Sequence, residues 1–170
     1  KLKMPANQIN PHFLYNTLNS IKMLVRLNRT NQINSTITAL VHILSNTLNK
    51  SSEFIPLEDE LQVLENYIYI QKMRYGNFEY KLFVPPDVLK YKVLRLILQP
   101  FIENAIQHGL GKTGGFIRIE ISVKKDHVDV EVSDNGPGFQ NSGNGDHRSI
   151  AMELVQQRLR LEGSGGYYEI

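Results

Sequence analysis

The chain has 170 residues, enough for one compact domain with a small helical element beside it. Its 19 basic and 17 acidic residues leave a net charge of only +2, and this dispersed, nearly balanced charge argues against nucleic acid or an anionic membrane surface as a partner. The sequence contains no cysteine, which excludes a disulfide framework, thiolate metal sites and thiol catalysis.

Two amphipathic helices are predicted at the start of the chain. Apolar residues recur at spacings of three and four, which predicts a first helix from about Pro5 to Arg29. The stripe of this helix centres on Leu14, Leu18, Ile21 and Val25. After a polar link, the stripe of the second helix consists of Ile33, Ile37, Leu40, Val41, Leu44 and Leu48. One hairpin cannot bury both stripes by itself, so we expect two copies to associate as a four-helix bundle.

The rest of the sequence predicts alternating helices and strands. A third helix has three acidic residues in its first turn, as the helix dipole favours, and Gly76 ends it. The expected order is a helix at 57–76, a strand at 78–84, a helix that ends at Gly109, a hairpin of strands at 116–124 and 128–133, a loop at 140–149 and a helix at about 150–161. The predicted fold class is α+β: a helical hairpin, then an α/β sandwich with a mixed sheet and helices on one face.

Two short motifs together indicate a nucleotide site. Asp134 ends a predicted strand and is followed by Gly136 and Gly138; its carboxylate can accept a hydrogen bond from an exocyclic amine, and the glycines leave the backbone bare for a flat ring. About 30 residues upstream, Asn104 offers a neutral oxygen that can complete a magnesium shell beside phosphates. Asn-Gly and Pro-Gly alone are ordinary turn dipeptides. The order and spacing of the two motifs favour the nucleotide site.

His12 is a candidate nucleophile. It falls opposite the apolar stripe of the first helix, so we expect it to face solvent. Near neutral pH an imidazole keeps a lone pair on one nitrogen, which can attack phosphorus without prior deprotonation. Asn16 lies one turn later on the same face, and we expect it to orient the ring. A surface histidine without a role is the alternative that position alone leaves open.

The motifs resemble those of a known family. ENAIQHG at 103–109 and DNGPGF at 134–139 resemble the N box and first glycine box of the ATP-binding domain shared by histidine kinases, gyrase, Hsp90 and MutL. QINPHFLYNTLNS at 8–20 resembles the phosphoacceptor segment of sensor histidine kinases of the LytS/YesM-like branch, and LQPFIEN at 98–104 also matches that branch. The resemblance covers nearly the whole chain, with the motifs in the family's order.

This resemblance implies ATP and Mg²⁺ as cofactors. Asp134 would accept a hydrogen bond from the adenine amine, and Gly136 and Gly138 would let the base and the following loop approach closely. Asn104 would bind Mg²⁺. Glu103 would position a water or act as a weak base, although a solvated glutamate on a helix face is an equally good reading.

The resemblance also implies phosphate-binding roles for other residues, and for these an alternative interpretation stays open. His108 and Lys112 would reach phosphates, or would simply be surface residues. Ser149 and Ala151 stand where the family usually has glycines, whose bare amides close on phosphates at the start of the last helix. Both replacements are small, so the altered second glycine box either keeps ATP with some crowding or loses it.

The resemblance implies a two-component sensor histidine kinase that phosphorylates His12 from ATP and passes the phosphoryl group to an aspartate of a response regulator. Residues 1–54 would form the homodimer and carry His12, and residues 55–170 would bind ATP. The alternative is a non-catalytic partner-binding module with a degenerate ATP site.

The chain starts just before the His12 motif and ends without the family's last strand, and no apolar run reaches the roughly 18 residues of a membrane span. We therefore expect the cytoplasmic portion of a bacterial cell-membrane sensor, attached to the membrane only through upstream segments.

Overall fold

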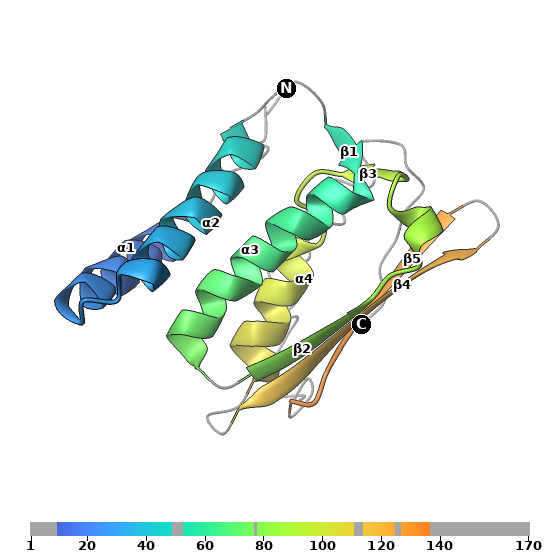
Figure 1. The fold of residues 1–170 in the computed structure, drawn as a ribbon. Coiled ribbons are helices and arrows are strands. Elements are labelled where there is room, and N and C mark those ends of the chain that lie inside the picture. The colour runs from blue at the N-terminus through green and yellow to red at the C-terminus, as the bar shows by residue number, and fades with distance from the viewer. Residues whose placement is uncertain (1–9, 49–52, 77, 111–113, 125–126, 137–170) are drawn as a thin grey trace, which may run out of the picture.

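The computed structural model describes residues 10–48, 53–76, 78–110, 114–124 and 127–136 (Figure 1). In chain order the elements are α1 (Pro11–Arg26), α2 (Thr30–Leu48), β1 (Phe54–Pro56), α3 (Leu57–Tyr75), β2 (Phe78–Phe83), the 3₁₀ helix η1 (Pro86–Val88), β3 (Lys92–Leu94), α4 (Gln99–Asn104), the π-helical turn η2 (Ala105–Gly109), β4 (Gly115–Lys124) and β5 (His127–Asp134). The expected loop at 140–149 and helix at 150–161 lie outside the described residues.

The helices α1 and α2 form the expected hairpin, which lies beyond α3 on the side away from the sheet (Figure 1). Asn10 caps α1 by accepting the backbone N–H of His12, and Pro11 occupies the first turn, where its missing N–H costs nothing. The helix ends at Arg26, earlier than the predicted Arg29, because the chain turns at Asn28, whose φ is 54°.

The side of α1 that packs inside the chain is beside the predicted apolar stripe rather than on it. Phe13 and Thr17 are buried, and the Thr17 hydroxyl donates to the Phe13 carbonyl at 2.8 Å, which satisfies it there. Leu18 and Val25 of the stripe are 50% and 54% exposed. The hairpin therefore keeps an uncovered apolar surface.

The helix α3 is the centre of the molecule. Leu57, Leu64, Tyr67 and Ile68 are almost completely buried between the hairpin on one side and the sheet with α4 on the other. Gly76 ends the helix with a φ of 74°, a conformation that favours glycine. The third helix and its end at Gly76 are thus confirmed.

A three-stranded sheet in the order β2-β4-β5 forms the far layer. The strands β2 and β4 are parallel, and β4 and β5 are antiparallel, so the sheet is mixed as predicted. Ile117, Ile119 and Ile121 alternate along β4 and are buried against α3 and α4, which cover one face of the sheet (Figure 1). The predicted α+β fold class is confirmed.

Two short elements were not predicted. Residues 51–56 read as a break and residues 92–94 as part of a helical run, but β1 and β3 pair as antiparallel strands, with Ile55 opposite Val93. The helix that carries the N box therefore begins only at Gln99. A short apolar run such as 93–98 is compatible with a strand or a helix, and here the pairing with β1 decides.

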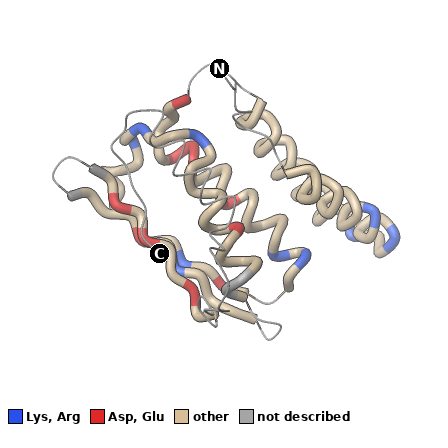
Figure 2. Tube along the Cα trace, turned by 180° about the vertical axis from the view of Figure 1, so that it is seen from behind, with Lys and Arg blue, Asp and Glu red and all other residues tan. Residues whose placement is uncertain are grey.

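Charged residues are spread over the described part of the molecule. Lys and Arg lie at the hairpin turn, at the end of α3, near β3 and on the sheet, whereas Asp and Glu lie on α3, on α4 and on the strands but not on α1 or α2 (Figure 2). None of the helices in the described ranges combines the length and apolar character that crossing a bilayer requires.

Candidate functional site

His12 is exposed in the first turn of α1, as predicted. The Asn16 side chain lies against its ring: Asn16 Nδ2 is 3.2 Å from Nδ1 and 3.3 Å from Nε2 of His12. The i, i+4 spacing brings the two side chains together on one helix face. An amide in this place can restrict the rotation of the imidazole ring.

The N box lies next to the start of α1. Asn10 Nδ2 donates to Glu103 Oε1 at 3.3 Å, and Gln107 Nε2 donates to the same oxygen at 3.1 Å. The predicted site residue Glu103 is thereby placed beside the segment that carries His12. Sequence reasoning did not single out Asn10.

Next to the Asn10–Glu103 hydrogen bond, α1 also packs on α3 through a buried aromatic pair. The rings of Phe13 and Tyr67 stack with centroids 5.0 Å apart and an interplanar angle of 29°. Burial raises the pKa of Tyr67 well above its ordinary value, and the nearby Glu103 carboxylate raises it further, so the phenol stays neutral. Gln71 Nε2 donates to the Tyr67 hydroxyl at 2.7 Å.

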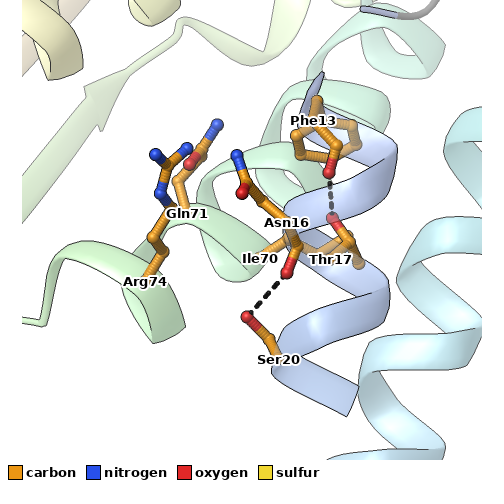
Figure 3. Close-up of a pocket in the computed structure, with 7 residues that line it drawn as sticks. All are labelled: Phe13, Asn16, Thr17, Ser20, Ile70, Gln71 and Arg74. Carbon is orange, nitrogen blue, oxygen red and sulfur yellow. Dashed lines mark hydrogen bonds between the residues drawn. The ribbon is translucent and has the colours of Figure 1, made fainter. Parts of the chain in front are cut away.

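A small polar cavity lies next to this pair, between α1 and α3. Its volume is about 10 Å³, room for roughly one water. The side chain of Asn16 extends from α1 toward α3, where Gln71 and Arg74 lie (Figure 3). The cavity is too small for a nucleotide, and Asn16 is the residue that it shares with the surroundings of His12.

Asp134 ends β5 and forms a tight local turn. Its Oδ1 accepts the backbone N–H of Gly136 at 2.8 Å, and Asn135 Oδ1 accepts the backbone N–H of Phe116 at 2.6 Å. Asp134 is exposed, so it remains accessible to a ligand. The prediction that a strand delivers this carboxylate is confirmed, whereas its role in reading adenine stays a prediction.

Asn104 is the last residue of α4 and is partly buried. The helix then widens into the π-helical turn η2, closed by a hydrogen bond from Leu110 N to Ala105 O at 3.1 Å. Such turns are frequent at functional sites. An amide oxygen is a hard ligand of the kind Mg²⁺ accepts, so Asn104 fits the predicted metal role chemically.

Gly115 marks where the two nucleotide motifs meet. A Cβ atom at this position would collide with the Leu110 side chain and crowd Asn135 Oδ1. Leu110 follows the N box, and Asn135 belongs to the first glycine box. Any other residue at this position would require the Leu110 side chain to move, although a glycine at the start of a strand gave no signal in the sequence.

Two buried charged residues connect the loop before α4 to other elements. Glu60 of α3 accepts the backbone N–H groups of Leu96 at 2.8 Å and Leu98 at 3.0 Å, in a loop where Leu96 has a φ of 56°. Arg95 donates from Nη1 to the Asn46 carbonyl in the last turn of α2. Sequence reasoning missed both. Arg95 was detectable as the single charge in the apolar run 93–98.

Several predicted site residues cannot be placed. Lys112, Gly138, Ser149 and Ala151 lie outside the described residues, as does the side chain of His108. Their roles, and the state of the altered second glycine box, stay predictions.

Comparison with known protein families gives two matches. The histidine kinase family matches residues 1–78, and the family of histidine kinase-, DNA gyrase B- and HSP90-like ATPases matches residues 90–166. Together they account for almost the whole chain.

Curated relatives agree with these matches. Sensor histidine kinase BtsS of Escherichia coli is 31% identical over 163 residues, covering 94% of this chain and 28% of that protein. Sensor histidine kinase YesM of Bacillus subtilis is 33% identical over 169 residues, covering 95% and 29%. Sensor protein LytS of Oceanobacillus iheyensis is 30% identical over 178 residues, covering 94% and 30%. The chain thus spans under a third of the length of these relatives.

A solved structure shares the fold. The blue-light activated histidine kinase of Erythrobacter litoralis superimposes with a TM-score of 0.50 and 18% sequence identity, covering 90% of this chain and 55% of the other. At this identity the likeness concerns the fold alone.

Proposed function

The chain belongs to the sensor histidine kinases, in the branch that includes YesM and LytS, and on this premise we propose that it phosphorylates His12 from ATP. It would then pass the phosphoryl group to an aspartate of a response regulator. The observation that carries the proposal is the position of His12, which is exposed, lies beside Asn16 and is close to the N box. The N box residue Glu103 is hydrogen-bonded to Asn10, which precedes His12 by two residues.

The proposed chemistry starts from the neutral imidazole. One ring nitrogen attacks the γ-phosphorus, the bond to the β-phosphate oxygen breaks, and ADP leaves. Rotation of the Asn16 amide exchanges its oxygen and nitrogen, which occupy equivalent positions. With its oxygen toward the ring, Asn16 would accept the N–H of whichever ring nitrogen carries the proton, and the other nitrogen would keep its lone pair for attack. Glu103 would position a water or act as a weak base.

The proposed nucleotide contacts follow the family motifs. Asp134 would accept the adenine amine, with Gly136 and Gly138 beside the base, and Asn104 would hold Mg²⁺, which neutralises phosphate charge in phosphoryl transfer. His108 and Lys112 are further candidates for the phosphates, and Ser149 and Ala151 for the closing helix.

We also propose that the protein works as a homodimer through α1 and α2, as the cytoplasmic portion of a membrane sensor. The support is the uncovered apolar surface of the hairpin, to which Leu18, Val25, Ile37 and Val41 contribute. Exposed apolar side chains gathered on one surface are typical of a protein interface.

Labelling with γ-labelled ATP tests the function. We expect label on the wild-type chain that is lost in acid and kept in base, as for a phosphoramidate, and no label on His12→Gln. His42→Gln, which alters an exposed histidine on α2, is the matched control and should label normally. Label on His12→Gln, or an acid-stable product, would contradict the assignment. A wild-type chain that neither labels nor binds ATP would favour the partner-binding module.

A further inference from the structure

Asn10 joins the phosphoacceptor helix to the N box of its own chain through the two ends of one amide. Its Oδ1 accepts the backbone N–H of His12 at 3.0 Å, and its Nδ2 donates to Glu103 Oε1 at 3.3 Å. The first bond caps the helix. The second connects segments 93 residues apart in the sequence and has a carboxylate as its acceptor.

A second contact fixes the same turn of α1. Phe13 is 5% exposed and stacks on Tyr67, which is 1% exposed. Asn10 and Phe13 therefore hold the chain on both sides of His12, which stays exposed between them. Two residues span at most about 7 Å, so the His12 backbone cannot move far from Glu103 while these contacts persist.

The docked arrangement is compatible with a dimer. Leu18 and Val25, which would join two hairpins, are half-exposed and lie on a different side of α1 from Phe13 and Thr17, which pack inside the chain. Forming the dimer therefore does not require that His12 leave the N box of its own chain.

We propose that Asn10 is a positioning residue that presents His12 to the N box of the same subunit, so that autophosphorylation occurs within one chain. This inference rests on the proposed function. Asn10 accepts in the bond that caps α1 and donates in the bond to Glu103, so a residue that accepts but cannot donate to Glu103 keeps the first role and loses the second. Aspartate at this position keeps a capping oxygen but loses the donor and brings a second carboxylate to Glu103, whereas serine keeps the cap and is too short to reach Glu103.

Kinetics of Asn10 variants test the positioning role. We expect Asn10→Asp to lower the maximal rate of His12 labelling about tenfold, with Asn10→Ser between it and wild type. The ATP concentration for half-maximal rate should stay within about twofold, because no proposed nucleotide ligand is changed. Asn19→Asp, the same change at an exposed site on α1, is the control and should label normally. A rate for Asn10→Asp equal to that of Asn19→Asp, or above wild type, would overturn the role.

Mixed dimers test whether the reaction stays within one chain. His12→Gln and Asp134→Asn chains are given different affinity tags, combined, and purified through both tags in turn. Phosphorylation within one chain predicts that the Asp134→Asn chain of the mixed dimer labels no more than a homodimer of Asp134→Asn chains does, whereas reaction between chains predicts label well above that level. Label above the level of that homodimer would overturn this inference and leave the proposed function intact. Wild-type dimers prepared identically must label; their failure would reject the proposed function as well.

Discussion

Asp134 has one hydrogen bond within the fold and, in the proposed function, a second one with the ligand. Its Oδ1 accepts the Gly136 N–H, and the residue remains exposed at the end of β5. An asparagine at this position keeps an oxygen for the turn but replaces the second carboxylate oxygen by an amide nitrogen, which repels the adenine amine. The substitution therefore separates the ligand role from the structural role.

We predict that Asp134→Asn weakens ATP binding by roughly 1 to 3 kcal/mol, because the adenine amine loses its acceptor. Glu103→Gln should leave ATP affinity close to wild type and lower turnover instead. Titration with a fluorescent ATP analogue measures the first effect and γ-phosphate labelling the second. Equal affinities of wild type and Asp134→Asn would refute the adenine site.

Residue spacing in the sequence was sufficient to predict contacts within one helix of the site but not contacts between distant segments. The approach of Asn16 to His12 follows from the i, i+4 relation within one helix, so the sequence was sufficient to predict it. The Asn10–Glu103 hydrogen bond depends on how α1 docks on distant segments, and no local pattern encodes that. The same limit applies to Gly115, where Leu110 and Asn135, which both lie outside its strand, leave little room for a Cβ atom.

At the scale of elements, the loop between β3 and α4 determines where the N box helix starts. Leu96 has a positive φ, which is unfavourable for a non-glycine residue. The buried Glu60 carboxylate accepts the N–H groups of Leu96 and Leu98 and so stabilises this conformation. The position of α4 thus depends on a side chain of α3.

We predict that Glu60→Gln lowers the free energy of unfolding by roughly 1 to 3 kcal/mol, because the amide offers one acceptor where two N–H groups need one each. Glu58→Gln, an exposed change in the same helical turn, is the control and should alter stability by less than about 0.5 kcal/mol. Urea denaturation followed by circular dichroism measures both. A Glu60→Gln chain as stable as Glu58→Gln would show that the loop does not depend on this carboxylate.

Elements with a strong local signal were predictable, and those defined by pairing were not. The third helix combines apolar periodicity, an acidic first turn and Gly76, so its identity and end were correct. The pairing of β1 with β3 involves only three residues of each strand, too few for a period to emerge. In α1, Thr17 is buried with its hydroxyl bonded to the backbone, whereas apolar Leu18 stays exposed, so hydrophobicity alone did not show which side of the helix packs inside the chain.

At the scale of the whole molecule, the uncovered side of the hairpin predicts an interface. We expect Leu18→Glu combined with Val41→Glu to weaken homodimerisation at least about tenfold, because each charge would be desolvated in an apolar contact. Met23→Glu is the control: Met23 is 63% exposed but lies opposite the stripe. Light scattering over a range of protein concentrations measures the effect. A wild-type chain that remains monomeric throughout, or equal disruption by Met23→Glu, would rule out this surface.

The buried contacts of α3 determine how the hairpin and the sheet unfold relative to each other. One continuous core runs from Phe13 and Ile43 of the hairpin through Tyr67 to Ile119 of the sheet. Removing the hairpin would expose the side of α3 that Ile43 and Phe13 cover, so neither part keeps its own complete core. We therefore predict that the hairpin and the sheet unfold as a single cooperative unit, so that amide hydrogen exchange in the two reports the same global opening.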